Sequence, residues 1–474
     1  MSKPLQVGNV ALGGGAPVTI QSMCNTATED VAATVAQIHV LEAAGCEIVR
    51  VAVPTMEAAQ AIGKIKSAIH IPLVADIHFD YKLALECAAQ GVDKIRINPG
   101  NIGAPERVRA VADACRERGI PIRVGVNGGS LEKEMLQKYG GVTAEALVES
   151  AMGHVKLLND CNFDDICLSV KCSHVPTNMA AYRLLAERTD YPLHLGVTEA
   201  GNGIEGRIKS AVGIGALLAD GVGDTIRVSL TEAPENEVPV AQMLVDHFQS
   251  REGEFEVLHP ERYSPTEYRR RTSAPIIAHS EITDNYIVID STSENPTAEW
   301  RAAILNADHD KPVVIRRHYE GAKEEVALYA AADMGQLLLD GLADGVWIDA
   351  PQIADAELHE IELIILQASR ARFSQTEYIA CPSCGRTLYN IEQALADIKA
   401  RTSHLKGLKI GVMGCIVNGP GEMADADYGY VGAGAGRISL YKGKECIERN
   451  IPQEEALERL IELIKANGDW KEKD

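Results

Sequence analysis

The sequence lacks any apolar run near the ~18–20 residues that a membrane-spanning helix requires. The residues Met1–Leu5 also lack the apolar region of a secretory signal. We therefore expect a cytoplasmic protein that makes no use of a membrane. Its 474 residues, 46% of them hydrophobic, are enough for two to three globular domains.

Positive charge is also scarce. The formal net charge is −21, which excludes binding to nucleic acid through bulk electrostatics. Against this balance, any local cluster of Arg and Lys is informative, because it opposes the charge of the whole chain.

The eleven cysteines are an odd number, and a disulfide framework is not expected in a cytosolic protein of this size. Most should be reduced, buried thiols that behave as small apolar groups. A few are candidate metal ligands.

A short apolar strand followed by an amphipathic helical pattern repeats eight times in the first 250 residues. This repetition predicts an N-terminal (β/α)8 TIM barrel. A doubly wound open sheet is the alternative, but no dinucleotide-binding fingerprint follows the first strand. The eight expected strands are Pro17–Met23, Glu47–Pro54, Pro72–Ile77, Lys94–Asn98, Pro121–Val126, Asp164–Lys171, Pro192–Glu199 and Asp224–Leu230.

Two further domains are expected after the barrel, which we place at residues 1–251. Residues 252–374 should form an inserted α/β domain, in which we find no catalytic constellation. Its first part contains Arg269–Arg271 and is typical of a solvated linker. Residues 375–474 should form a C-terminal α/β domain that carries three cysteines of interest.

Five of the predicted barrel strands place an Arg or Lys within or at the end of an apolar run. Burying one unpaired cation costs several kcal/mol, and the nearby carboxylates Asp76 and Glu199 are too few to compensate five. The pattern indicates a highly charged anionic ligand, because Arg supplies forked donors to phosphate oxygens. The alternative is that these side chains face outward and pair with helix carboxylates. The five cations are Arg50, Arg96, Arg123, Lys171 and Arg227.

Other polar residues end the same strands, where a barrel of this type places its active site. The segment Asn127–Ser130 could also offer backbone N–H donors at a helix start. The remaining candidates are Asp76, His78, Asn127, Thr198, Glu199 and Ser229.

Cys381, Cys384 and Cys415 form a pattern typical of a metal site. The Cys-x-x-Cys pair lets two thiolates reach one metal, and Cys415 lies in a glycine-rich turn that can approach a cluster closely. Spacing alone leaves zinc, with Cys446 or His404 as a further ligand, and an iron–sulfur cluster equally open. A redox Cys-x-x-Cys would need no third cysteine.

Together these segments resemble the 4-hydroxy-3-methylbut-2-enyl diphosphate synthase family of the non-mevalonate isoprenoid pathway. The resemblance covers roughly residues 1–250 and 375–474. The stretches that carry it are Val18–Asn25, Glu47–Met56, Pro72–Asp80, Arg96–Gly103, Arg123–Ser130, Leu193–Gly201, Asp224–Leu230, Cys381–Cys384 and Gly414–Glu422.

The resemblance implies an enzyme that opens the ring of 2-C-methyl-D-erythritol 2,4-cyclodiphosphate by reduction and removes water. It implies a [4Fe–4S] cluster held by Cys381, Cys384, Cys415 and Glu422, which favours iron over zinc. Cys446 is then left without a role. The five cations would hold the diphosphate, assisted by Asn127 and Ser229, while Asp76, His78 and Thr198 line the pocket and Glu199 donates a proton.

The resemblance further implies reduced flavodoxin or ferredoxin as the electron donor. The inserted segment places the chain with the longer members of the family. In short members, the cluster domain of one subunit caps the barrel of its partner in a homodimer. The sequence leaves open which barrel is capped here. Two rivals stay open: a barrel enzyme with an appended zinc module, and a non-catalytic electron-transfer or scaffold protein.

Overall fold

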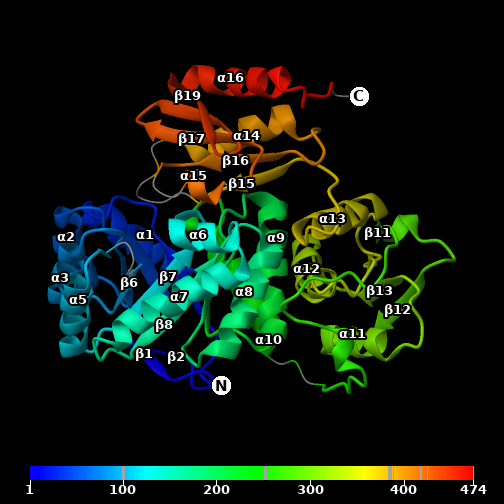
Figure 1. The fold of residues 1–474 in the computed structure, drawn as a ribbon, viewed down its shortest axis with the longest axis horizontal. Coiled ribbons are helices and arrows are strands. Elements are labelled where there is room, and N and C mark those ends of the chain that lie inside the picture. Colours follow the sequence, from blue (N-terminus) through cyan, green and yellow to red (C-terminus); the bar gives the residue numbers. More distant parts are fainter. Residues whose placement is uncertain are drawn as a thin grey trace.

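The computed structural model describes residues 1–98, 102–249, 251, 253–382, 387, 389–416, 419–423 and 425–472. It shows a barrel, a smaller α/β unit beside it, and a third unit above the barrel mouth (Figure 1). None of the helices in this described part combines the length and apolar character of a membrane span.

Eight parallel strands form a closed barrel in the first half of the chain. Their order is β8-β7-β6-β5-β4-β3-β10-β9, and a parallel bridge from Leu168 to Leu193 joins the ends. This confirms the predicted barrel and excludes the open sheet. The strands are β3 (Thr19–Met23), β4 (Ile48–Ala52), β5 (Leu73–Asp76), β6 (Lys94–Ile97), β7 (Ile122–Asn127), β8 (Ile166–Lys171), β9 (His194–Leu195) and β10 (Thr225–Ile226).

Helices surround the barrel, and local sequence sets their ends. Thr55 and Thr143, for example, each accept a hydrogen bond from a first-turn N–H group, and Gly119 ends its helix at φ 64°, where glycine is favoured. The surrounding helices are α1 (Val31–Ala43), α2 (Met56–Lys66), α3 (Tyr81–Ala89), α5 (Pro105–Arg118), α7 (Ala144–Asn159), α8 (Val175–Arg188), α9 (Gly203–Ala219) and α10 (Glu237–Gln249).

Short elements complete this unit. The hairpin of β1 (Leu5–Val7) and β2 (Val10–Leu12) packs its apolar side chains on Ile48, Val74 and Cys167, and so closes the barrel at the end opposite the site. The remaining short helices follow strand β7 or precede helix α10. They are η1 (Gly128–Ser130), α6 (Lys133–Tyr139) and η2 (Pro234–Asn236).

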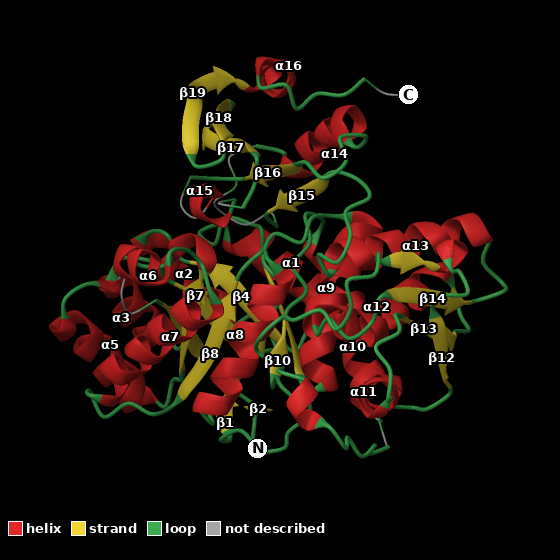
Figure 2. Cartoon of the chain, turned by 45° about the vertical axis from the view of Figure 1, so that its right-hand side comes forward, coloured by secondary structure: helices red, strands yellow, loops and turns green. Residues whose placement is uncertain are grey.

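The middle unit is a four-stranded parallel sheet of order β11-β14-β13-β12 with helices against it. This unit packs on barrel helix α9 (Figure 2). Its elements are η3 (Pro260–Arg262), β11 (Ile277–Ala278), η4 (His279–Glu281), β12 (Ile287–Ser291), α11 (Pro296–Asn306), β13 (Val313–His318), α12 (Lys323–Leu339), β14 (Gly345–Asp349) and α13 (Asp355–Ala368).

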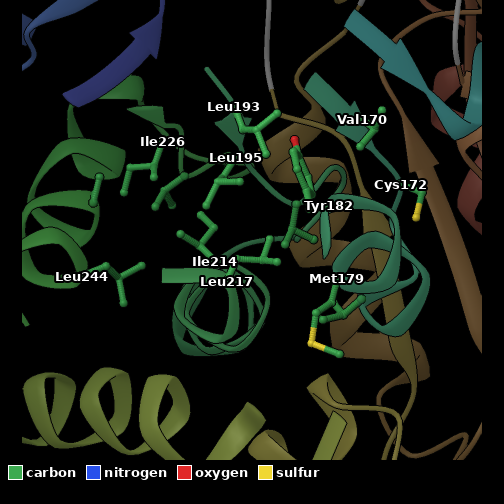
Figure 3. Packing of buried hydrophobic residues seen from close by; sticks show 14 of the residues in the cluster. Val170, Cys172, Met179, Tyr182, Leu193, Leu195, Ile214, Leu217, Ile226 and Leu244 are labelled. Atoms are coloured by element: carbon green, nitrogen blue, oxygen red, sulfur yellow. The ribbon is translucent and has the colours of Figure 1, made fainter. Parts of the chain in front are cut away.

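Helix α9 is buried between the barrel wall and helix α12. Its residues Ile214 and Leu217 point toward Leu195 of the barrel (Figure 3). On the opposite side, a Cβ atom added to Gly215 would lie 2.9 Å from the Cα atom of Ala332 in α12. The absence of a side chain at Gly215 therefore sets how closely the two helices approach.

Charged side chains join the barrel to the middle unit as well. Arg183 of α8 contacts Asp220 at 2.6 Å and Asp340 at 2.7 Å, and all three are largely buried. The segment predicted to be a solvated linker is also engaged, because Arg270 and Arg271 both pair with buried Asp344. The described residues of 251–275 are exposed or half-buried, as expected of a linker, but periodicity could not show that a carboxylate from a distant loop pairs with two of its arginines.

The C-terminal unit has a five-stranded sheet, β15-β16-β17-β18-β19, parallel in its first three strands and antiparallel in the rest. The antiparallel strands β17 and β18 form a hairpin whose turn is Ala435-Gly436. The elements are β15 (Glu377–Ala380), α14 (Ile391–Thr402), β16 (Lys409–Met413), α15 (Gly419–Glu422), β17 (Tyr428–Gly434), β18 (Arg437–Lys442), β19 (Glu445–Pro452) and α16 (Gln453–Ala466).

The close contact of α9 with α12 generates a prediction. Replacing Gly215 by Ala should lower the free energy of unfolding by about 1–3 kcal/mol, because the added methyl group overpacks a helix interface. The matched control is Gly153→Ala at an exposed position of α7, where an added Cβ atom meets nothing within 4 Å. In that variant the free energy of unfolding should rise by about 0.4–1 kcal/mol. Urea denaturation measures both; equal effects of the two substitutions would contradict the packing argument.

Candidate functional site

The carboxyl ends of the barrel strands and the C-terminal unit enclose one cavity, with an empty volume of about 960 Å³ including its mouth. A single chain supplies both halves of it. Cys384 lies outside the described residues. All other candidate residues line the cavity: Arg50, Asp76, His78, Arg96, Arg123, Asn127, Lys171, Thr198, Glu199, Arg227, Ser229, Cys381, Cys415 and Glu422.

Strand register places the charged residues beside one another. Asp76 is the Cα partner of Arg96, and Arg96 is the partner of Arg123, on three adjacent strands. In the same way Asn127 pairs with Lys171. Because alternate residues of a strand share a face, these side chains all point into the barrel and not toward the outer helices.

Two inward-facing glycines make room for the long cations. A Cβ atom on Gly125 would lie 2.5 Å from Nε of Arg96, and one on Gly196 would lie 2.6 Å from Nζ of Lys171. Neither glycine was predicted from the sequence to be a site residue. The signal was present, because a glycine inside an apolar strand marks a close approach.

Carboxylates neutralise only part of the positive charge. Asp76 accepts a hydrogen bond from Nη1 of Arg96 at 3.1 Å and lies 3.4 Å from Nε2 of His78. Buried Glu237, which the sequence analysis missed, pairs with Arg227 at 3.3 Å. Glu237 begins α10, and no strand pattern marked it as facing the barrel interior.

Arg123 carries the clearest sign of a missing anion. Its guanidinium is buried, and in the described part of the chain Nε and Nη1 have no hydrogen-bond partner. Burial, followed by the charge of Arg96, lowers the pKa of Arg123 to about 10. Burial and the neighbouring cations also hold the pKa of Lys171 well below its usual range. A polyanion would remove both penalties.

Lys94 adds a sixth cation to the barrel interior, two residues before Arg96 on β6. It is fully buried, and among the described residues its Nζ atom has no hydrogen-bond partner. Burial lowers its pKa to about 8. Lys94 does not line the cavity, so it influences the site through its charge and not by contact.

Glu199 occupies an unusual backbone conformation. Its φ of 52° lies in the left-handed region, which costs a residue with a Cβ atom free energy and recurs at functional sites. Its carboxyl group is buried and hydrogen-bonded with that of Glu422, and burial raises the pKa of both groups. Thr198 also donates to Oε2 of Glu422 at 3.3 Å.

Two short glycine-rich helices, α15 and η1, meet where Glu422 enters the cavity. A Cβ atom on Gly421 would overlap the carbonyl oxygen of Gly129, so the two helices touch through bare backbone. The N–H group of Gly129 donates to the carboxyl group of Glu422. The segment Asn127–Ser130 was expected to offer backbone N–H groups to a phosphate. Its Gly129 N–H group instead binds a carboxyl group of the C-terminal unit.

The segment Ala380–Cys381 of the C-terminal unit is also held against the barrel. Ala200 and Ala380 form a parallel bridge, and the hydroxyl of Thr231 donates to the carbonyls of Ala380 and Cys381 at 3.2 and 3.1 Å. These contacts hold Cys381 at the barrel mouth.

Cys381 and Cys415 reach the cavity with Glu422, and the N–H group of Gly414 donates to Sγ of Cys381 at 3.1 Å. Iron–sulfur ligands accept such N–H···S bonds. The donor set therefore suits a cluster as far as it is described. Cys446 donates to a backbone carbonyl on β19 and does not line the cavity. The remaining cysteines are buried, as expected of core thiols: Cys24, Cys46, Cys87, Cys115, Cys161, Cys167 and Cys172.

Two family models match the chain. The GcpE TIM-barrel domain matches residues 2–242, and the GcpE protein C-terminal domain matches residues 377–466. Each model covers one half of the cavity.

The chain is similar over almost its full length to proteins named 4-hydroxy-3-methylbut-2-en-1-yl diphosphate synthase (flavodoxin). That of Porphyromonas gingivalis is 42% identical over 568 aligned positions, covering 99% of this chain and 97% of the relative. That of Bacteroides fragilis is 39% identical over 602 positions, covering 99% and 96%. Yersinia pestis dihydropteroate synthase superposes with a TM-score of 0.38 at 11% identity, over 52% of this chain and 98% of that one.

The isolated charge of Lys94 generates a prediction about pH. Lys94→Met should raise the free energy of unfolding at pH 7 by about 2–4 kcal/mol, because it removes an uncompensated buried cation. Between pH 8 and 10.5 the unfolded wild type holds this proton and the folded wild type has lost it. The free energy of unfolding of the wild type therefore rises with pH relative to that of the variant, and the stability difference between the two proteins becomes smaller.

Denaturant titrations of both proteins across pH 7–10.5 test this. A difference that stays constant with pH, or a less stable variant at pH 7, would refute the assignment of Lys94 as an unpaired buried cation.

Proposed function

Because this chain belongs to the GcpE family of 4-hydroxy-3-methylbut-2-en-1-yl diphosphate synthases, we infer that it is an oxidoreductase of isoprenoid biosynthesis. It converts 2-C-methyl-D-erythritol 2,4-cyclodiphosphate into 4-hydroxy-3-methylbut-2-en-1-yl diphosphate. The conversion takes up two electrons, opens the ring at a carbon–oxygen bond and releases one water.

The observation that carries the proposal is the shared cavity. Arginines of the barrel line one side, and Cys381, Cys415 and Glu422 line the other. A substrate held by its diphosphate would thus present its carbon skeleton to the C-terminal unit. A structural zinc module or an electron-transfer scaffold would need no such cation cluster opposite its cysteines.

We propose that the five cations at the strand ends clamp the diphosphate. Arg123 supplies two donors that have no protein partner in the described residues, and Lys171 supplies a compact charge. Arg96 forms an ion pair with Asp76, and Arg227 forms one with Glu237. These pairs fix the orientation of the two guanidinium groups. Binding the anion removes the mutual repulsion of the cations, so the substrate stabilises the site that receives it.

Cys381, Cys415 and Glu422, with Cys384 from outside the described residues, would hold a [4Fe–4S] cluster. When bound, the cluster supplies electrons and a Lewis-acidic iron. Reduced flavodoxin is the donor that the names of the relatives indicate, and ferredoxin is the alternative.

Glu199 is the proposed proton donor. It lies at the meeting point of the barrel and the C-terminal unit, and its strained backbone fixes the carboxyl group in the cavity. A buried carboxylic acid there can protonate the substrate hydroxyl that leaves as water. Thr198 positions the carboxyl of Glu422 beside it.

In the described part of the chain, the barrel cations and the residues Cys381, Cys415 and Glu422 that line the cavity belong to the same polypeptide. We therefore propose that this protein does not need a homodimer partner to cap its barrel. The domain limits 1–251, 252–374 and 375–474 remain predictions.

The ligand assignment predicts opposite outcomes for two cysteine substitutions. Cys415→Ser should lose cluster iron and consumption of the cyclic diphosphate, while the barrel stays folded. Cys446→Ser is the control and should keep both, because Cys446 lies away from the cavity. Anaerobic purification, iron analysis, visible absorption and an assay with reduced flavodoxin measure these outcomes. Full activity of Cys415→Ser, or iron loss in Cys446→Ser, would overturn the ligand set.

The role of Glu199 predicts a separation of binding from turnover. Glu199→Gln should bind the cyclic diphosphate with little change but lower kcat by about 10²–10⁴-fold, the usual contribution of a general acid. Substrate affinity and steady-state rates, at equal iron content, provide the measurement. Unchanged kcat would remove Glu199 from the proton transfer.

A further inference from the structure

A second group of metal-ligating side chains lies in the middle unit, away from the cavity. Strand β11 ends at Ala278, and His279 follows it directly as the first residue of η4. Helix α13 packs next to this strand end and contributes His359 and Glu362. The group therefore sits at the carboxyl edge of a parallel sheet, where α/β units bind ligands.

The three side chains converge. One ligand atom each of His279, His359 and Glu362 lies within 4.8 Å of the other two. His359 and Glu362 are three residues apart on α13 and so share one face of the helix. Nδ1 of His279 is 2.7 Å from Oε2 of Glu362. Zinc–ligand bonds of about 2.0–2.1 Å place tetrahedral donors about 3.3 Å apart, so adjustments of at most about 1.5 Å would close the set.

The surroundings fix these donors. The side chain of Glu362 is fully buried, and its two oxygens accept hydrogen bonds from the N–H groups of Ile348 at 2.8 Å and His279 at 3.0 Å. The ring of Trp347 stacks on that of His279 at 6.3 Å, and Ser280 lies 3.0 Å from Nδ1 of His359. Metal-binding histidines and carboxylates are commonly held by outer hydrogen bonds of this kind.

The charge balance also points to a cation. Among the described residues no Lys or Arg pairs with Glu362, and His279 is its ion-pair partner. A simple His–Glu pair would satisfy one carboxylate but gives no reason for a second imidazole to converge on it. A divalent ion would use all three groups.

A second trio, His39, Glu42 and His70, meets the same distance criterion but is more exposed. Glu42 also accepts hydrogen bonds from the N–H groups of His70 and Ile71, but the side chain of His70 is 84% exposed, whereas that of His279 is 19% exposed. Exposed groups lose more side-chain entropy when they are ordered by an ion. This trio serves as an internal control.

We propose that His279, His359 and Glu362 bind one divalent transition-metal ion, of which zinc best matches two imidazoles and a carboxylate. Water would complete the coordination. The ion would tie η4 to α13, next to the pair of Glu281 with Arg372 in the segment that leads to the C-terminal unit. The site does not depend on the proposed reaction, and its ligands lie outside the substrate cavity.

Titration of the cluster-loaded, anaerobic enzyme with Zn²⁺ by calorimetry, and with Co²⁺ by visible absorption, tests the proposal. Wild type should bind one equivalent, with a Co²⁺ spectrum free of thiolate charge-transfer bands. His359→Ala should weaken binding by at least about tenfold and leave the reductive activity unchanged. His70→Ala should bind like wild type.

His359 is half-buried, and its contacts with Ser280 and with the edge of the His279 ring are local, so its replacement should not unfold the unit. Glu362→Gln is the second variant and should also lose binding. Three results would overturn the proposal: no saturable binding by wild type, equal binding by wild type and His359→Ala, or loss of binding in His70→Ala. A thiolate-type Co²⁺ spectrum would assign the ion to cysteines and equally refute the site.

Discussion

The repulsion among cations inside the barrel is the constraint on which the rest of the structure depends. At an effective dielectric constant near 20, two unit charges about 5 Å apart repel by about 3 kcal/mol. The strand register nevertheless fixes Arg96 next to Arg123. Asp76 and Glu237 offset part of this cost from neighbouring positions. The remainder is free energy that folding supplies and an anionic substrate recovers, which links the stability of the barrel to the identity of its ligand.

The position of the C-terminal unit follows from a different constraint, the absence of side chains. Gly421 and Gly129 meet backbone to backbone, and only this approach lets Glu422 enter the barrel mouth. Thr231 and the bridge at Ala380 then hold the first cysteine loop on the same rim. Cations of the barrel and cysteines of the C-terminal unit therefore line the same cavity.

The middle unit is joined to the barrel through packing and charge together. Helix α12 lies against α9 at glycine distance, and Arg183 crosses the junction to Asp340. Alignments to the relatives span 568 and 602 positions, more than the 474 residues of this chain, so the relatives contain internal segments absent here. The sheet of the middle unit carries the pair of His279 with buried Glu362 at its strand ends.

The sequence by itself determined the barrel, the inward cations and the cysteine pattern, because alternation along a strand and helix caps are local properties. Arg50, Lys171 and Arg227 could be named from their place in apolar runs alone. Only the tertiary structure showed Glu237 beneath Arg227, Gly125 and Gly196 beside the long side chains, Asp344 beneath Arg270, and residues of the C-terminal unit lining the barrel cavity. Each of these depends on contacts between segments far apart in sequence, and no local pattern specifies which distant backbone or carboxylate will fill the space beside a given residue.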